Sequence, residues 1–68
     1  MTFGEVFRFL EDGRKIRRHS WKVGFYWFAR DGDIFSYVWE SSFGVGFTEV
    51  ARIYGYDLMA KDWEVVEE

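Results

Sequence analysis

Residues 14–22 read RKIRRHSWK and gather five of the chain's nine Lys and Arg residues beside its only His and a Trp, although the formal net charge is −3. Arginine guanidinium groups bind phosphate through paired hydrogen bonds. An indole offers a flat face on which a nucleobase stacks. The stretch therefore indicates one of two structures: a site for an anionic ligand with a flat group, such as a nucleotide, or a charged strand edge that discourages pairing with other sheets.

Residues that could perform catalysis are sparse. The chain contains no Cys, His19 is its single His, and none of its Ser residues lies in a nucleophile-elbow pattern. The acidic residues near the C-terminus are typical of a solvated surface, and Asp31-Gly32-Asp33 is far shorter than a calcium-binding loop. We therefore predict a protein that is not an enzyme, with no catalytic residues, no metal site and no cofactor.

Length and composition set the organisation of the chain. Sixty-eight residues allow one domain, predicted over residues 1–68. Sixteen of them are aromatic, and since each buries roughly 150–250 Å², a monomer of this size cannot hide them all. With no Cys and one His, neither disulfides nor a metal reinforces the core. We therefore predict a homo-oligomer, either a dimer or a tetramer.

Partners and location follow from charge and hydropathy. The last twelve residues carry a net charge of −4, which would repel a nucleic-acid backbone, so a small anion fits the basic stretch better than polymeric nucleic acid does. No apolar run approaches the ~20 residues that a membrane span requires. The N-terminus has no signal-like segment. We expect a cytoplasmic protein with no membrane partner.

The first residues predict an amphipathic helix over about 3–12. Thr2 and Glu5 form a capping-box pattern, in which each side chain hydrogen bonds to the backbone N–H of the other residue. Gly13 supplies a stop, because glycine adopts positive φ without steric cost. The apolar residues fall on one helical face, at i, i+3, i+4 and i+7. They are Phe3, Val6, Phe7 and Leu10.

The segment FYWFAR-DG-DIFSYVWE predicts a β-hairpin, because Asp31-Gly32 suits the positive φ angles of a two-residue turn. The register that this turn sets pairs Tyr26 with Tyr37, Phe28 with Phe35 and Ala29 with Ile34. One face would carry Gly24, Tyr26, Phe28, Phe35, Tyr37 and Trp39, and the other Phe25, Trp27, Ala29, Ile34, Ser36 and Val38. Because both faces are apolar, one can pack on the helix and the second requires a cover, either a second subunit or a ligand.

Three further segments read as strands, at residues 14–18, 46–53 and 63–66. Asp57 is predicted to cap a short turn over residues 58–60. The predicted fold class is α+β, with one N-terminal helix packed on a small antiparallel sheet of about four or five strands.

The two ends of the chain resemble one family of small phage and bacterial proteins. TFGEVFRFLEDGRKIRRHSW is similar to an opening motif F-G-E-A-x-x-x-L-x-x-G-x-x-[IV]-x-R-x-x-W, and DLMAKDWEVV is similar to a closing motif D-L-[LM]-A-x-D-W-x-[IV]. Together the two segments cover about 30 of the 68 residues. The motifs are those of the Thoeris anti-defence sponge family. Arg18 and Trp21 match its R-x-x-W, and Asp57, Asp62 and Trp63 match its closing motif.

The resemblance implies a phage-type anti-defence protein that binds and sequesters a cyclic nucleotide immune signal without cleaving it. The signal would be glycocyclic ADP-ribose-like or a cyclic dinucleotide, held in pockets at the subunit interfaces of a homo-oligomer in the host-cell cytoplasm. The alternative function, which the aromatic content favours, is an interaction module that docks on a host protein and inhibits it.

The predicted ligand-binding residues come from the basic stretch and from the segment that ends at the closing motif. They are Arg17, Arg18, Trp21, Tyr54, Tyr56 and Asp57. The arginines would bind phosphate, the aromatic side chains would stack on bases or ribose, and the carboxylate would accept from a hydroxyl or a base N–H. Many members of the family carry a pattern like P-W-x-x-S-x-x-D before the closing motif, whereas residues 52–56 of this chain read RIYGY. One of the two tyrosines would therefore replace that Trp.

Overall fold

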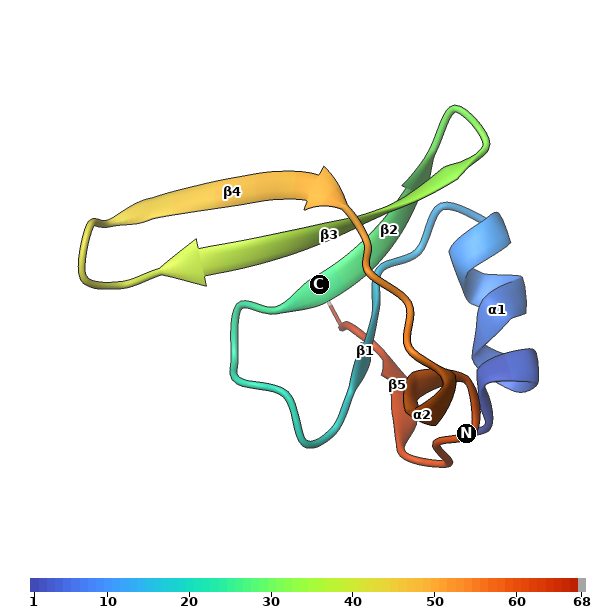
Figure 1. The fold of residues 1–68 in the computed structure, drawn as a ribbon. Helices are drawn as coiled ribbons and strands as arrows, with labels where there is room; N and C mark the ends of the chain where they lie inside the picture. Colours follow the sequence, from blue (N-terminus) through green and yellow to red (C-terminus); the bar gives the residue numbers. More distant parts are fainter. Residues whose placement is uncertain (68) are drawn as a thin grey trace.

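The computed structural model describes residues 1–67 and has the predicted α+β architecture (Figure 1). Its elements in chain order are α1 (Phe3–Glu11), β1 (Ile16–Arg18), β2 (Tyr26–Arg30), β3 (Asp33–Glu40), β4 (Val45–Val50), α2 (Gly55–Leu58) and β5 (Trp63–Val65). Within the described residues the strands form one five-stranded sheet in the order β4-β3-β2-β1-β5. Every neighbouring pair in it is antiparallel, which confirms the predicted sheet.

The two helices lie toward one end of the sheet, and the β3–β4 hairpin projects from the other (Figure 1). Helix α1 packs on the sheet through Phe3, whose ring contacts the indoles of Trp27 and Trp63. Neither helix in the described part of the chain is long and apolar enough to cross a membrane. Helix α1 contacts β1, β2 and β5 and leaves the part of the same sheet face that lies over β3 and β4 uncovered.

Helix α1 begins at the predicted capping box. The Thr2 N–H donates to Glu5 Oε1 at 2.9 Å, and the Glu5 N–H donates to Thr2 Oγ1 at 3.3 Å. These hydrogen bonds, led by the one from the Thr2 backbone, lower the pKa of the Glu5 carboxyl group. The helix ends at Glu11, and Gly13 has a φ of 85°, as its predicted role in the stop requires.

The β2–β3 hairpin also forms as predicted. Asp31 and Gly32 have φ angles of 52° and 78°, which are the positive values of a tight turn that matches the twist of the strands. The observed pairs are the predicted ones: Tyr26 with Tyr37, Phe28 with Phe35 and Ala29 with Ile34. Because side chains alternate along each strand, this register assigns every residue of the hairpin to one of the two sheet faces.

The hydrophobic core lies between α1 and the sheet face that carries Trp27. Its buried members are Val6, Leu10, Ile16, Trp27 and Trp63. Trp27 and Trp63 have ring centroids 5.1 Å apart, and Trp21 packs against both at 5.3 Å. Aromatic pairs at such distances stabilise a core beyond the area that they bury. Three indoles therefore fill much of the interior of this small chain.

The opposite sheet face is aromatic, and neither helix described covers it. We define this aromatic face by Tyr26, Phe28, Phe35, Tyr37 and Trp39. Tyr26 stacks on Tyr37 at 4.9 Å, and Phe28 stacks on Phe35 at 5.7 Å. Trp39 keeps 47% of its surface exposed. A sheet face that meets only water normally carries polar side chains, so this one has the character of a contact surface.

Some predicted boundaries are wrong. The strand expected over 46–53 is β4, Val45–Val50, because the chain leaves the sheet after residue 51 and turns toward α2. The first strand, expected over 14–18, covers only Ile16–Arg18. Asp57 does not cap a turn that follows it. It lies inside α2, and its carboxylate accepts from the Tyr54 N–H at 3.4 Å, behind it in the chain.

We expect Leu10→Ala to lower the free energy of unfolding by about 2–5 kcal/mol, because Leu10 is fully buried in the core and its truncation leaves a cavity. Denaturation with urea, followed by circular dichroism, measures this loss. Phe9→Ala is the control, since Phe9 is the neighbouring residue on the exposed side of α1. An equal loss in both variants would contradict the packing of the helix described here.

Candidate functional site

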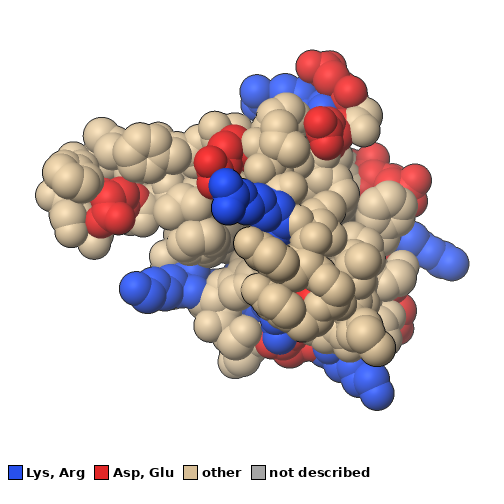
Figure 2. Space-filling model, in the orientation of Figure 1, with Lys and Arg blue, Asp and Glu red and all other residues tan. Residues whose placement is uncertain are grey.

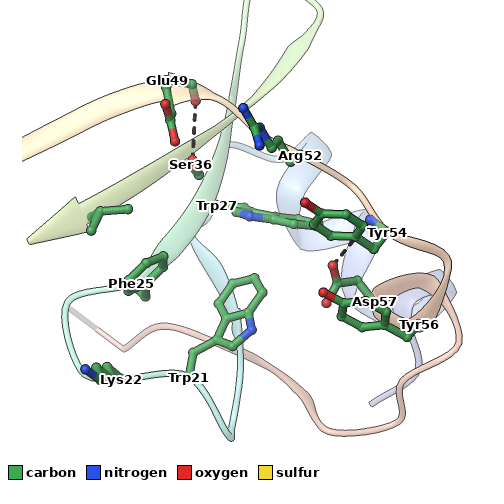
Figure 3. Close-up of a pocket in the computed structure, with 11 residues that line it drawn as sticks. Trp21, Lys22, Phe25, Trp27, Ser36, Glu49, Arg52, Tyr54, Tyr56 and Asp57 are labelled. Atoms are coloured by element: carbon green, nitrogen blue, oxygen red, sulfur yellow. Dashed lines mark hydrogen bonds between the residues drawn. The ribbon is translucent and has the colours of Figure 1, made fainter.

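A cavity of about 480 Å³ opens on the sheet face that carries α1, beside that helix (Figure 3). Three parts of the chain form it: the middle of β2, β3 and β4, the loop between β1 and β2, and the segment that leads from β4 into α2. Its lining residues are Trp21, Lys22, Phe25, Trp27, Ser36, Val38, Glu49, Arg52, Tyr54, Tyr56 and Asp57.

The floor of the cavity is a row of side chains that crosses three strands. Trp27 on β2 pairs with Ser36 on β3, and Ser36 pairs with Glu49 on β4. Ser36 is 8% exposed, and its hydroxyl donates a long hydrogen bond of 3.5 Å to the backbone carbonyl of Glu49. An indole, a hydroxyl and a carboxylate thus stand next to one another on one face.

Aromatic side chains form the walls. Tyr54 and Tyr56 stack with ring centroids 5.3 Å apart and only 4° between their planes. Trp21 and Phe25 line the other side, from the loop between β1 and β2 (Figure 3). Tyr56 is 65% exposed, so a ligand that covered it would remove a large aromatic surface from water. Flat groups are the natural occupants of such walls.

Two cations line the cavity. Lys22 lies in the loop between β1 and β2, and Arg52 lies in the segment that follows β4 (Figure 3). No ion pair within residues 1–67 includes either of them. Both are therefore free to bind an anionic group, and Arg52 has the planar fork that grips phosphate at two points.

Arg18 lies outside the cavity lining and is held by two acids. Its Nε lies 2.8 Å from Asp62 Oδ1, and its Nη1 lies 3.3 Å from Asp57 Oδ1. Its hydrogen bond to Asp62, the largest contribution, raises the pKa of Arg18 and lowers that of the Asp62 carboxyl group. Asp57 is 4% exposed, and its ion pair with Arg18 compensates the buried negative charge.

Arg17 is also engaged within the chain. Its Nε lies 3.5 Å from Glu64 Oε1, and the same atom donates to the backbone carbonyl of Arg18 at 3.2 Å. Its Nη2 donates to the carbonyl of Trp21. These bonds fix the loop that carries Trp21 and Lys22 against β1. Arg17 therefore shapes the wall of the cavity and does not line it.

The two terminal motifs meet in this network. The indole Nε1 of Trp63 donates to the carbonyl of Asp57 at 2.8 Å, and Trp63 packs on Trp21. Arg18, from the opening motif, joins Asp57 and Asp62, from the closing motif. The motif residues thus connect β1, α2 and β5, and these connections hold in place the segments that carry Trp21, Tyr54 and Tyr56.

Four of the six residues predicted to bind the ligand line the cavity: Trp21, Tyr54, Tyr56 and Asp57. Arg17 and Arg18 do not line it, and whether any of the six contacts a ligand stays a prediction. The sequence analysis did not identify the other lining residues, which are Lys22, Phe25, Trp27, Ser36, Val38, Glu49 and Arg52. One signal was present, since residues 52, 54 and 56 alternate as cation, aromatic and aromatic in RIYGY.

Comparison with known protein families gives a match over almost the whole chain. The model of a family described as a Thoeris anti-defense 2-like domain matches residues 1–66 of the 68. This match confirms the resemblance that the two terminal motifs indicate. A search among curated proteins finds no match.

We expect acid to destabilise the fold through Asp62 and Glu5. Both carboxyl groups have folded-state pKa values below their unfolded values, so their stabilisation is present above about pH 4 and is lost as the pH falls through the folded-state values. The melting temperature should therefore drop between about pH 5 and pH 2.

Asp62→Asn should lower the melting temperature at neutral pH and flatten this acid dependence, because the asparagine cannot titrate. Glu67→Gln removes the same charge from an exposed position outside the network and should leave the dependence unchanged. Identical acid profiles for Asp62→Asn and the unmodified protein would contradict the role given to the Arg18 network.

Proposed function

The chain belongs to the family of Thoeris anti-defense 2-like domains, and from that premise we propose that it binds and sequesters a cyclic nucleotide immune signal without cleaving it. Membership supports an anti-defence role. The proposal adds how that role is carried out: the cavity beside α1 captures a small signalling nucleotide and lowers its free concentration. Sequestration of this kind requires tight binding by the folded protein and no turnover.

The observation that carries the proposal is the combination of unpaired cations and stacking walls in one cavity. Lys22 and Arg52 supply positive charge, and neither forms an ion pair within residues 1–67. Trp21, Tyr54 and Tyr56 supply flat surfaces beside them. A nucleotide has a matching pair of features, an anionic phosphate and a planar base. The volume of about 480 Å³ lies within the roughly 300–1,000 Å³ of typical small-molecule sites.

The cavity floor favours binding over cleavage. Ser36 is the hydroxyl there, and its proton is directed to the main-chain carbonyl of Glu49. A carbonyl does not act as a general base, and no hydrogen bond within residues 1–67 joins this hydroxyl to the Glu49 carboxylate or to another side-chain base that would activate it as a nucleophile. We therefore propose that a bound nucleotide leaves the protein chemically unchanged.

Thermal-shift measurements with candidate cyclic nucleotides test the proposal. A ligand present at a hundredfold excess over its dissociation constant should raise the melting temperature by roughly 10–20 °C. Arg52→Gln should weaken binding about 10–100-fold through the loss of a charge-assisted hydrogen bond. Tyr56→Ala should weaken it about 5–100-fold through the loss of stacking.

Arg14→Gln is the matched control, because it removes the same charge from an exposed residue outside the cavity. Chromatography of the ligand released by heat should recover it intact. A lack of any shift with cyclic ADP-ribose-like and cyclic dinucleotide candidates would refute the proposal, and a chemically altered ligand would identify an enzyme.

We also propose that the protein is a homo-oligomer and that copies associate through the aromatic face. Stacked rings occupy this face, and Trp39 on it remains half-exposed. The projecting end of the β3–β4 hairpin is largely uncharged and carries no Lys or Arg in the view of Figure 2. Burial of such a surface against a second copy would remove it from water.

Light scattering coupled to gel filtration should give a mass of at least two chains. Trp39→Lys should shift the protein toward the monomer, because it places a charge within the proposed contact, at its most exposed ring. Val23→Lys is the control, since Val23 is an exposed loop residue outside the aromatic face. A one-chain mass for the unmodified protein would contradict association.

The alternative function, docking on a host protein, would use this same aromatic face. It predicts a monomer that binds no cyclic nucleotide and loses its inhibitory effect in Trp39→Lys. The nucleotide function predicts that the inhibitory effect follows Arg52 and Tyr56. The two sets of variants therefore separate the two functions.

A further inference from the structure

Glu49 lines the cavity in which we propose that an anionic ligand binds. Its side chain extends from β4 toward the cavity in Figure 3. Within residues 1–67 no ion pair includes its carboxylate, and its side chain takes part in none of the hydrogen bonds there. A carboxylate repels phosphate, so Glu49 weakens the binding of a nucleotide that donates no hydrogen bond to it. An N–H donor on the ligand would form that hydrogen bond.

The neighbours of Glu49 define which donor pattern fits. Directly opposite it stands the hydroxyl of Ser36, and opposite Ser36 stands the indole of Trp27. Directly opposite residues have Cβ atoms about 4.5–5.5 Å apart, so the carboxylate and the hydroxyl reach one ligand edge together. The 3.5 Å bond from Ser36 to the Glu49 carbonyl is long, and the hydroxyl can donate to a ligand instead.

We infer that Glu49 and Ser36 select a ligand with a guanine-type base edge, an inference that rests on the proposed function. The base-pairing edge of guanine presents, in order, a 2-amino group, a ring N–H and a carbonyl oxygen. The two N–H groups match the two oxygens of the Glu49 carboxylate, and the carbonyl accepts from the Ser36 hydroxyl. Adenine offers the carboxylate only its single amino group, and the neighbouring ring nitrogen is an acceptor, so one carboxylate oxygen is left without the donor that guanine supplies.

The cations and the carboxylate therefore have different tasks. Arg52 and Lys22 contact phosphate, which every nucleotide carries, so they set affinity without choosing a base. Glu49 repels a ligand that lacks adjacent N–H donors and binds one that has them, which is how a polar site obtains selectivity. The proposed ligand class is thus a guanine-bearing cyclic nucleotide.

Isothermal titration calorimetry with three probes tests this inference: 3′,5′-cyclic GMP, cyclic IMP and cyclic AMP, each also used as the corresponding cyclic dinucleotide. Cyclic IMP differs from cyclic GMP only by the absent 2-amino group. The unmodified protein should bind the guanine probe about tenfold or more tightly than the adenine probe, with the hypoxanthine probe between them.

Glu49→Gln should bring the guanine-to-adenine ratio close to one, because the amide both donates and accepts. Glu67→Gln removes the same charge outside the cavity and should keep the ratio. Ser36→Ala should weaken the guanine and hypoxanthine probes equally. Thermal melts of each variant establish that it is folded.

The possible failures are distinct. Binding of all three bases with equal affinity, or a ratio that Glu49→Gln leaves unchanged, overturns this inference and leaves the proposed function standing. If none of the cyclic nucleotides binds to the unmodified protein, the proposed function fails and the inference falls with it. A Ser36→Ala variant that alters only the guanine probe overturns the contact assigned to the Ser36 hydroxyl.

Discussion

The ion pairs of one side chain, Arg18, hold together the part of the fold on which the cavity depends. Arg18 ends β1, and it binds Asp57 in α2 and Asp62 just before β5. Helix α2 spans only Gly55–Leu58, and an isolated helix of one turn is not stable in water. The Asp57 carboxylate accepts from the Tyr54 N–H at the start of that turn. Arg18 therefore positions Tyr54 and Tyr56 through Asp57, without touching the space that they enclose.

This arrangement separates the residues that build the cavity from those that give it chemistry. Arg18, Asp57, Asp62 and Trp63 belong to the two terminal motifs, and they are bonded mainly to one another. Residues 52–56, where the chain departs from the family pattern, supply an unpaired cation and two stacked rings to the lining. Substitutions in this segment would alter the lining of the cavity while the supporting network stays intact.

Features that arise from neighbouring residues could be predicted from the sequence. The capping box of α1 and the Asp31-Gly32 turn depend on contacts a few residues apart, and their pattern is visible in the chain. The extent of α2 and the engagement of Arg18 could not be predicted in the same way, because they depend on carboxylates about 40 residues away. A basic stretch does not reveal which of its cations the folded chain neutralises. The clustering of Arg17 and Arg18 favours them as phosphate ligands, whereas the cavity cations that form no ion pair within residues 1–67 are Lys22 and Arg52.

The high aromatic content of this short chain serves two surfaces, one on each face of the sheet. A sheet with one helix-bearing face must use alternate residues of β2 and β3 for different surfaces, since successive side chains point to opposite sides. Trp27 forms part of the core and the cavity floor, whereas its neighbours Tyr26 and Phe28 lie on the aromatic face. The two surfaces therefore share one backbone. Contact at the aromatic face would therefore restrain the strands that carry Trp27 and Ser36, which form the floor of the cavity.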